Sequence, residues 1–430
     1  MKHWMLLLVT GLSLGAMQAQ VGIGTVTPDP SAALDIDDTT RGFLMPRMST
    51  AQRTAIVNPA VGLLVYDTDD HNMWCFAGSD WVKVMSPAAL VLVDDDEDTQ
   101  VQVEATPDED VIRFDVAGVE VAAFDGQTFK MESPGKSVFI GTDAGSADNG
   151  TDNFNTALGY QSQQSNSSGW GNTSSGYQAL QDNTVGSFNT AHGYQALAEN
   201  TTGSFNVAVG DRALRSATSS NNVGVGALTL LSTTGSSNFA GGHRALHQTT
   251  SGSRNIAAGT EALYSNTTGE LNTALGFHAL YANTTKSHLV AIGDSALFHN
   301  GTGAASSLQA TENTAVGSQA MYANTTGYRN TAVGFQALHD NSTGDSNTAI
   351  GDNALSSNTS GRHNTATGYL ALVNNVSGHF NSAYGYNALG LNTDGDGNTG
   401  IGNGVLSFNS TGHHNTAVGM SAMANNTAGS

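Results

Sequence analysis

The sequence predicts an all-β chain whose larger part is a parallel β-solenoid, or β-roll, of ~17-residue coils. The first observation is a glycine that recurs at a fixed spacing. Of the fifteen intervals between successive glycines from Gly159 to Gly419, twelve are 17 residues, two are 16 and one is 24. The second is that nearly every repeat is cut twice by Gly and is rich in Asn and Thr, which disfavour helix interiors. Each interval should therefore be one coil.

The repeat is most legible from Asn330 to Gly344. Within it, Asn-Thr-Ala-x-Gly and the following x-x-Ala-Leu predict two short strands per coil. The Asn-Thr-Thr-Gly segments, such as 324–327, predict a turn whose Gly accepts a positive φ. We count about 16 coils after a degenerate first one at 138–141.

Residue size along the first strand predicts how the coils pack. The position two before the recurring Gly is almost always Ala, as at Ala332, and the next is a larger apolar residue, as at Val333. Aromatic residues such as Phe335 follow the Gly. Both faces of the strand are thus apolar, whereas a solitary solvated strand should alternate with polar residues. We expect one face to line the coil and the other to meet a second chain, most simply in a homotrimer.

An Asn begins the first strand in most coils. We expect these side chains to form a structural ladder from coil to coil rather than a binding site. The four histidines His192, His243, His278 and His339 fall at different offsets, so we do not expect them to pair as metal ligands.

Composition excludes several classes of protein. With 15 basic and 36 acidic residues the net charge is −21, which opposes binding to nucleic acid or to an anionic membrane. Cys75 is the only cysteine, so no disulfide forms within one chain. We expect it to be buried between Trp74 and Phe76, the alternative being a bridge between chains.

The chain divides into four predicted regions. Residues 1–19 are typical of a cleaved secretory signal, and no later stretch could form a transmembrane helix. Residues 20–85 should form a small module, with a helix from Ser49 to Ile56 and strands at 63–66, 73–76 and 81–84. Residues 86–137 are an acidic β-rich neck, and residues 138–430 are the solenoid.

The neck contains one candidate metal site. Asp94, Asp96, Asp98 and Glu104 place carboxylates at alternate positions, which is how a loop can wrap Ca²⁺. The glycine usual in such loops is missing, so a solvated acidic edge strand is the alternative. We expect no other cofactor.

The repeats offer no arrangement typical of catalysis. Asp211, Asp294 and Asp352 share one offset but lie several coils apart, so they cannot converge as the paired carboxylates of a polysaccharide-cleaving solenoid must. No nucleophile elbow, P-loop or dinucleotide fingerprint stands out. We therefore expect a protein that is not an enzyme.

Two resemblances point to fibres. The tracts 20–25, 31–36 and 41–48, with Gln52 and Arg53, resemble the N-terminal segment of exported bacterial surface fibre proteins. The Asn-Thr-Ala-x-Gly-x-x-Ala-Leu repeat is similar to the head repeats of trimeric autotransporter adhesins and to related phage-tail-like fibres. These resemblances imply three parallel β-rolls around one axis, an extracellular or cell-surface location, and attachment to matrix or surface glycans.

The long interval between Gly293 and Gly317 predicts a loop that leaves the coil. Its residues Asn300, Gly301, Thr302, Gly303, Ser306 and Ser307 are candidates for contacting a partner, although a neutral insertion is the alternative.

Two further expectations concern the shaft. A rank of threonines, including Thr331 and Thr348, leaves open a water-ordering or ice-binding solenoid. Residues 425–430 form the turn of an ordinary coil, so we expect this end of the shaft to associate with another chain.

Overall fold

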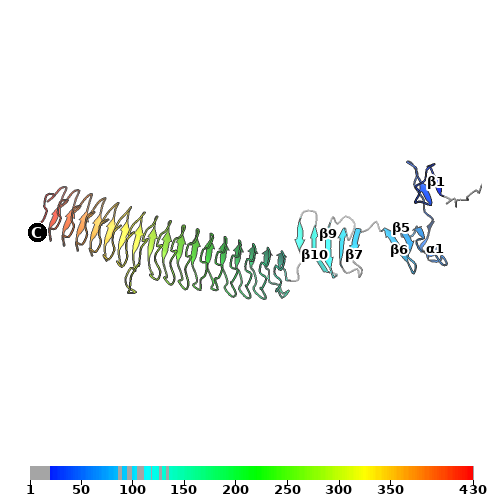
Figure 1. Cartoon of the computed structure of the whole chain (residues 1–430), viewed down its shortest axis with the longest axis horizontal. Coiled ribbons are helices and arrows are strands. Elements are labelled where there is room, and N and C mark those ends of the chain that lie inside the picture. The colour runs from blue at the N-terminus through cyan, green and yellow to red at the C-terminus, as the bar shows by residue number, and fades with distance from the viewer. Residues whose placement is uncertain are drawn as a thin grey trace, which may run out of the picture. The chain divides into compact units, whose positions relative to one another are not determined.

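The computed structural model describes residues 20–85, 90–93, 99–103, 111–117, 119–124, 128–131 and 135–429. The chain forms two compact units that divide between Lys130 and Met131. Figure 1 shows short sheets in the first unit and a long row of coils in the second. The predicted signal, residues 1–19, lies outside the described residues.

The first unit begins with two small sheets. Strands β1 (Val21–Ile23) and β2 (Leu34–Ile36) pair in parallel. A four-stranded sheet has the order β3 (Arg47–Met48), β4 (Leu64–Asp67), β5 (Asn72–Phe76) and β6 (Trp81–Met85), in which only β3 and β4 are parallel. The helix α1 (Thr50–Thr54) begins with a capping box between Ser49 and Gln52. The predicted helix and strands are therefore present, with ends shifted by one or two residues.

A buried ion pair holds α1 against β4. Arg53 donates from Nε to Oδ2 of Asp67 at 2.9 Å, and its guanidinium lies 3.8 Å from the ring centroid of Trp74. Burial raises the pKa of the Asp67 carboxyl, but hydrogen bonds from Arg53, the Asp69 amide and Thr50 outweigh it and hold that pKa below its usual value. Asp67 is thus kept ionised beside Arg53.

The first unit also contains a five-stranded sheet in the order β11-β10-β9-β8-β7. Its strands are β7 (Leu90–Val93), β8 (Gln100–Val103), β9 (Ile112–Val116), β10 (Val119–Phe124) and β11 (Phe129–Met131). Neighbours from β7 to β10 are antiparallel. The strands predicted from the alternating residues at 101–104 and 111–116 correspond to β8 and β9.

The second unit is a parallel β-solenoid, as the sequence predicts. One parallel sheet of 17 strands runs through it, in chain order from β12 to β28. The strands are β12 (Val138–Ile140), β13 (Thr156–Leu158), β14 (Thr173–Ser175), β15 (Thr190–His192), β16 (Val207–Val209), β17 (Val223–Val225), β18 (Phe239–Gly241), β19 (Ile256–Ala258), β20 (Thr273–Leu275), β21 (Val290–Ile292), β22 (Thr314–Val316), β23 (Thr331–Val333), β24 (Thr348–Ile350), β25 (Thr365–Thr367), β26 (Ser382–Tyr384), β27 (Thr399–Ile401) and β28 (Thr416–Val418). The degenerate first coil is real, since β12 pairs with β13 in register.

Each coil has one strand, and the prediction of two is wrong. We number the positions of a coil from the Asn before the strand, so that Asn330 is position 1 and Ser346 is position 17. At positions 7 and 9, Gln336 and Leu338 both have φ of 51°, alternating with right-handed neighbours. The Gln336 amide then donates back to Ser318 O and the Leu338 amide donates forward to Ala354 O. The x-x-Ala-Leu segment therefore bonds to both neighbouring coils as a chain of turns.

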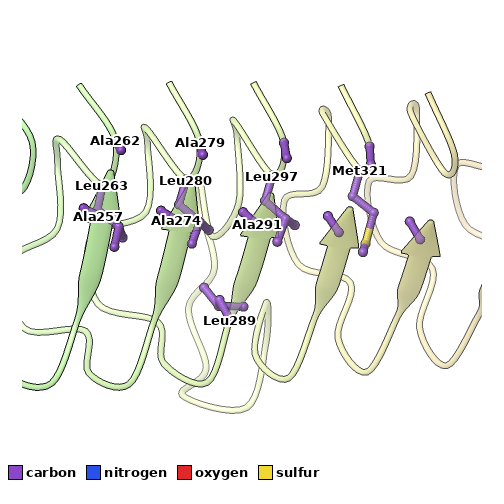
Figure 2. Close-up of a cluster of buried hydrophobic side chains, with 14 of the residues drawn as sticks. Ala257, Ala262, Leu263, Ala274, Ala279, Leu280, Leu289, Ala291, Leu297 and Met321 are labelled. Carbon is purple, nitrogen blue, oxygen red and sulfur yellow. The ribbon is translucent and has the colours of Figure 1, made fainter. Parts of the chain in front are cut away.

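The interior of each coil is thin. Position 3 of the strand and positions 8 and 9 of the turn segment point inward, and they are Ala, Ala and Leu in most coils. Figure 2 shows this pattern, with Ala274 on its strand and Ala279 and Leu280 on the facing segment. Such a small core leaves much of the cohesion to bonds between coils.

Glycine at position 5 is required by the spacing of the coils. Gly334 has φ of 141°, and a Cβ there would lie 2.4 Å from the carbonyl oxygen of Gly351. No other residue fits this column without moving the next coil. The recurring glycine is thus a consequence of coil stacking.

Two asparagine ladders run along the solenoid, the second interrupted in the coils of β16, β17 and β18, where position 12 is Ala217, Thr233 and Thr249. At position 1, the Asn330 amide donates to Oδ1 of Asn313 at 2.9 Å, and Asn330 Nδ2 donates to Gly344 O at 2.9 Å. At position 12, Nδ2 of Asn341 donates to Oδ1 of Asn324 at 2.9 Å. The first ladder was predicted as a structural feature; the second was predicted only as a turn. Both are buried and hold neighbouring coils together.

Candidate functional site

The outward face of the 17-stranded sheet carries many exposed apolar side chains, interspersed with polar residues such as Asp211, Asp294 and Asp352. Positions 4 and 6 alternate with the buried Ala and point away from the coil interior. At position 6 the exposed rings are 43–51 % accessible, and they are Tyr160, Tyr177, Tyr194, Phe277, Phe335, Tyr369 and Tyr386. At position 4 the aliphatic side chains Leu158, Ile292, Val333, Ile350 and Ile401 are 37–48 % accessible. The predicted second apolar face therefore exists and is uncovered in the single chain.

Position 2 adds a rank of threonines to this outward face. Its members include Thr314, Thr331 and Thr348, each partly exposed. Within the described chain, the hydroxyls of these three make no hydrogen bond. By contrast, position 13 hydroxyls bond to the next coil, as Thr359 Oγ1 does to Val376 O at 3.1 Å. The position 2 hydroxyls are thus free to meet water or another chain.

The coil of β21 is the expanded one and runs from Leu289 to Glu312. It projects from the row of coils in Figure 1. Thr302, Gly303, Ser306 and Ser307 are exposed at its surface, and Gly301 is half-buried. Asn300 is fully buried, and its Nδ2 donates to Ala310 O at 2.9 Å. Five of the six predicted contact residues are therefore accessible, while Asn300 acts as a ladder residue.

Two substitutions in the repeat accompany this expansion, and sequence reasoning missed both. Lys286 stands at position 15, where most other coils have Gly, and its Nζ donates to Ser306 O at 2.7 Å. Leu289 stands at position 1 in place of Asn and is buried. The signal that could have found them was the break in two otherwise regular columns just before the long interval.

The position 12 ladder also breaks at the expanded coil. Asn283 Oδ1 is buried and has no hydrogen-bond partner within the described structure: Asn300 Nδ2 donates to Ala310 O alone, whereas Asn324 Nδ2 donates both to Gly327 O and to the preceding Asn. The ladder resumes at Asn300, whose Oδ1 accepts from Asn324 Nδ2 at 2.7 Å. The expanded coil is therefore a discontinuity in the hydrogen bonding of the shaft.

A shallow depression lies beside the expanded coil. It has a volume of about 180 Å³ and is lined by Leu308, Gln309, Thr311, Glu312, Tyr328 and Arg329. Leu308 is exposed, and Glu312 accepts from Arg329 Nε at 2.9 Å. This hydrogen bond raises the pKa of the Arg329 guanidinium. The depression thus combines one apolar side chain with a closed ion pair.

The remaining candidate metal ligands fall partly outside and partly within the described residues. Asp94, Asp96, Asp98 and Glu104, the predicted calcium ligands, lie outside the described residues. Among the residues that are described, no group of three or more His, Cys, Asp or Glu could hold a metal ion. His192, His243, His278 and His339 occupy positions 4, 6, 7 and 10 of their coils, as the sequence predicts.

The three aspartates considered for catalysis stay apart. Asp211, Asp294 and Asp352 all stand at position 6, in the coils of β16, β21 and β24. At ~4.8 Å per coil, even the nearest two are more than 10 Å apart. Cys75 is half-buried, so the expectation of a fully buried thiol is wrong.

The fold and the outward face together define a class of protein, the β-solenoid fibre. Residues 22–101 match the family model of the phage tail like trimerisation region. This match supports a fibre of the phage-tail-like kind and self-association of the chain as a trimer. Searches of curated proteins and of solved structures gave no match. In the described part of the chain, no helix is long and apolar enough to cross a bilayer.

Proposed function

We propose that the chain is the subunit of a secreted, trimeric fibre that serves attachment at the cell surface and carries no catalytic activity. The observation that carries the proposal is the uncovered apolar face formed by positions 4 and 6. Repeated exposed aliphatic and aromatic side chains on one face of a shaft are unusual for a soluble monomer and typical of a surface that another chain covers.

The trimerisation match at residues 22–101 supports the same arrangement. An N-terminal region that joins three chains would deliver three shafts in parallel. Their outward faces could then cover one another with the same residues at each level, as closed symmetry requires. Attachment would be left to the turns and to the expanded coil.

The packing can be tested with Val316→Asp and Val333→Asp together. Both side chains lie at position 4, so a buried interface would gain six carboxylates per trimer. We expect the shafts to separate or unfold, seen as a lower mass or larger hydrodynamic radius in solution. Thr343→Asp, at an exposed turn position, is the control and should change neither. An unchanged mass and radius with intact β signal in the double variant would contradict the packing.

Attachment can be tested separately on the expanded coil. Replacing Thr302, Ser306 and Ser307 with Ala removes three exposed hydroxyls without touching Asn300 or Lys286. We expect coated beads to bind less well to glycan or matrix surfaces. Undiminished binding would show that the expanded coil is not the contact.

A second candidate, ordering of water at an ice surface, is favoured by one observation. The position 2 hydroxyls point outward and are unbonded within the described chain. Because they share the sheet face with positions 4 and 6, this function would require the face to stay open. Ice recrystallisation inhibition by the wild type, lost in Thr331→Ala/Thr348→Ala, would favour it over the trimer.

A further inference from the structure

The corner formed by positions 16 and 17 differs between the two halves of the shaft. From β14 to β20, position 16 is Ser in every coil except that of β19, which has Glu270. From β22 to β27 no coil has Ser there, and the residues are Tyr328, Asp345, Arg362, His379, Asp396 and His413. Position 16 is therefore nearly uniform in one half and diverse in the other, whereas position 17 varies in both.

Serine is sufficient for the structural task at this corner. The Ser187 amide donates to Ser204 Oγ at 3.0 Å, and the Ser236 amide donates to Ser253 Oγ at 3.2 Å. His379 makes the equivalent hydrogen bond between coils, since its Nδ1 accepts from the Arg362 amide at 3.0 Å. The larger residues are thus not needed to join the coils, and some other property must account for them.

The bond to His379 also fixes the tautomer of its ring. Because Nδ1 accepts from a backbone amide, the proton of the neutral imidazole lies on Nε2. His379 therefore offers a hydrogen-bond donor away from the coil.

His379 lines an open depression of about 460 Å³, together with Ser360, Arg362, His363 and Phe380. The volume is in the range of sites for small molecules, ~300–1,000 Å³. Phe380 stacks on His363 at a centroid distance of 5.0 Å. Its ring is nevertheless 63 % exposed, because Gly397 follows it in the column and has no side chain to cover it. The corner thus combines an open aromatic ring with polar groups.

The polar groups include both donors and an acceptor. Arg362 forms an ion pair with Asp345, with Nε 3.0 Å from Oδ1, and with the side chain 54 % exposed its terminal nitrogens remain available. The Ser360 hydroxyl makes no hydrogen bond within the described chain. A ligand with closely spaced groups that both donate and accept would match this set.

The charges of the corner select against an anion. Arg362 is paired with the buried Asp345, and Asp396 Oδ1 accepts from the His379 amide at 2.6 Å. One guanidinium between two carboxylates leaves no positive excess. The chain as a whole carries −21, which adds long-range repulsion of anions.

We propose that the corner at Ser360, Arg362, His363, His379 and Phe380 binds a neutral pyranose sugar. The apolar face of the sugar would cover the Phe380 ring, and its hydroxyls would bond to Arg362, His379 and Ser360. This proposal rests on the attachment function and deepens it, since it names the site and the class of ligand.

The repeat itself supplies variants that should fold. Serine occurs naturally at position 16 of a coil, as Ser236, and at position 17, as Ser346. The variants Arg362→Ser, His379→Ser and Phe380→Ser therefore each introduce a residue that other coils of this shaft already have at that position. His413→Ser makes the same change two coils further on, outside the depression, and serves as the matched control.

The experiment is saturation-transfer NMR on the full chain with methyl glycosides of glucose, galactose, mannose and N-acetylglucosamine, and with methyl glucuronide as the charged counterpart. We expect at least one neutral glycoside to bind. Arg362→Ser and Phe380→Ser should weaken that binding by about ten-fold or more, whereas His413→Ser should leave it unchanged.

Three results would overturn the proposal: no binding of any neutral glycoside, undiminished binding by both variants, or a preference for the glucuronide. A lower oligomer mass for Phe380→Ser would also overturn it, because the ring would then belong to the interface between chains. If beads attach but no glycoside binds, the pocket is wrong and the attachment function stands. If glycosides bind but beads attach to nothing, the attachment function fails instead.

Discussion

The regular coil from Asn330 to Ser346 and the expanded coil from Leu289 to Glu312 contain the same strand, the same buried Ala and the same buried Leu, but differ at the opposite corner. In the regular coil, the Asn side chain at position 12 bonds to the preceding coil, and Asn at positions 1 and 12 both bond to the carbonyl of Gly at position 15 of their own coil. In the expanded coil, the chain leaves this corner, and Lys286 reaches into the space through its bond to Ser306. The difference teaches that the strand side of the coil fixes the fold, whereas the turn side can be rebuilt locally.

The largest effect should come from breaking the close approach of regular coils. Gly334→Ala would place a Cβ 2.4 Å from Gly351 O, in a conformation that costs about 1–3 kcal/mol for a residue other than Gly. We expect local loss of structure on both sides of β23, measured as faster amide hydrogen exchange. Gly303→Ala in the expanded coil is the contrast, since its φ of 78° also disfavours Ala but nothing lies within 4 Å of its Cβ, so only the clash with the next coil differs. Equal effects of the two changes would contradict the account of coil stacking.

The next effect concerns the position 12 ladder. Asn341→Ala removes bonds to Asn324 and Gly344 and leaves buried partners unsatisfied, at a cost of about 2–4 kcal/mol. Asn283→Ala should cost less, because Asn283 Oδ1 has no partner to lose. Denaturation followed by circular dichroism measures both. A larger loss at Asn283 than at Asn341 would mean that the break in the ladder is misplaced.

A third test converts the expanded coil into a regular one. Removing seven residues between Gly301 and Thr311 brings the next coil close to position 15, where Lys286 no longer fits. At the equivalent Gly344, a Cβ would lie 2.3 Å from Gly361 O. We therefore expect the deletion alone to lower the melting temperature, and the deletion with Lys286→Gly and Leu289→Asn to restore it. Restoration by the deletion alone would show that Lys286 does not depend on the expansion.

The smallest effect should come from the lysine alone. Lys286→Met keeps most of the buried stem but removes the bond from Nζ to Ser306 O, at a cost of about 1 kcal/mol. We expect little change in melting temperature but faster proteolysis within 301–311. Unchanged proteolysis would indicate that other contacts hold the expanded coil.

The sequence was sufficient to predict the solenoid because its constraints repeat. The Gly at position 5, the Ala at position 3 and the Asn at position 1 recur for a stacking reason, so periodicity alone reveals the coil. The number of strands per coil was not predictable in the same way. Residues such as Gln336 and Leu338 carry no propensity signal for a positive φ, and only the bonds between coils impose it.

The candidate site was less predictable. The long interval located the expanded coil, but the burial of Asn300 and the bond of Lys286 depend on how the chain folds back. The corner at Arg362 and Phe380 brings together residues from neighbouring coils, about 17 positions apart in the sequence. Its diversity becomes visible only when the repeats are aligned by the coil positions that the structure defines.

The central claim is that three shafts pack through the outward face of the sheet. The most direct measurement is electron paramagnetic resonance between spin labels on the full chain, with Cys75→Ser as background and a single label at Val333→Cys or Thr343→Cys. The account predicts a short distance between chains for position 333 and a longer one for position 343. Equal distances, or no distance between chains at position 333, would contradict it.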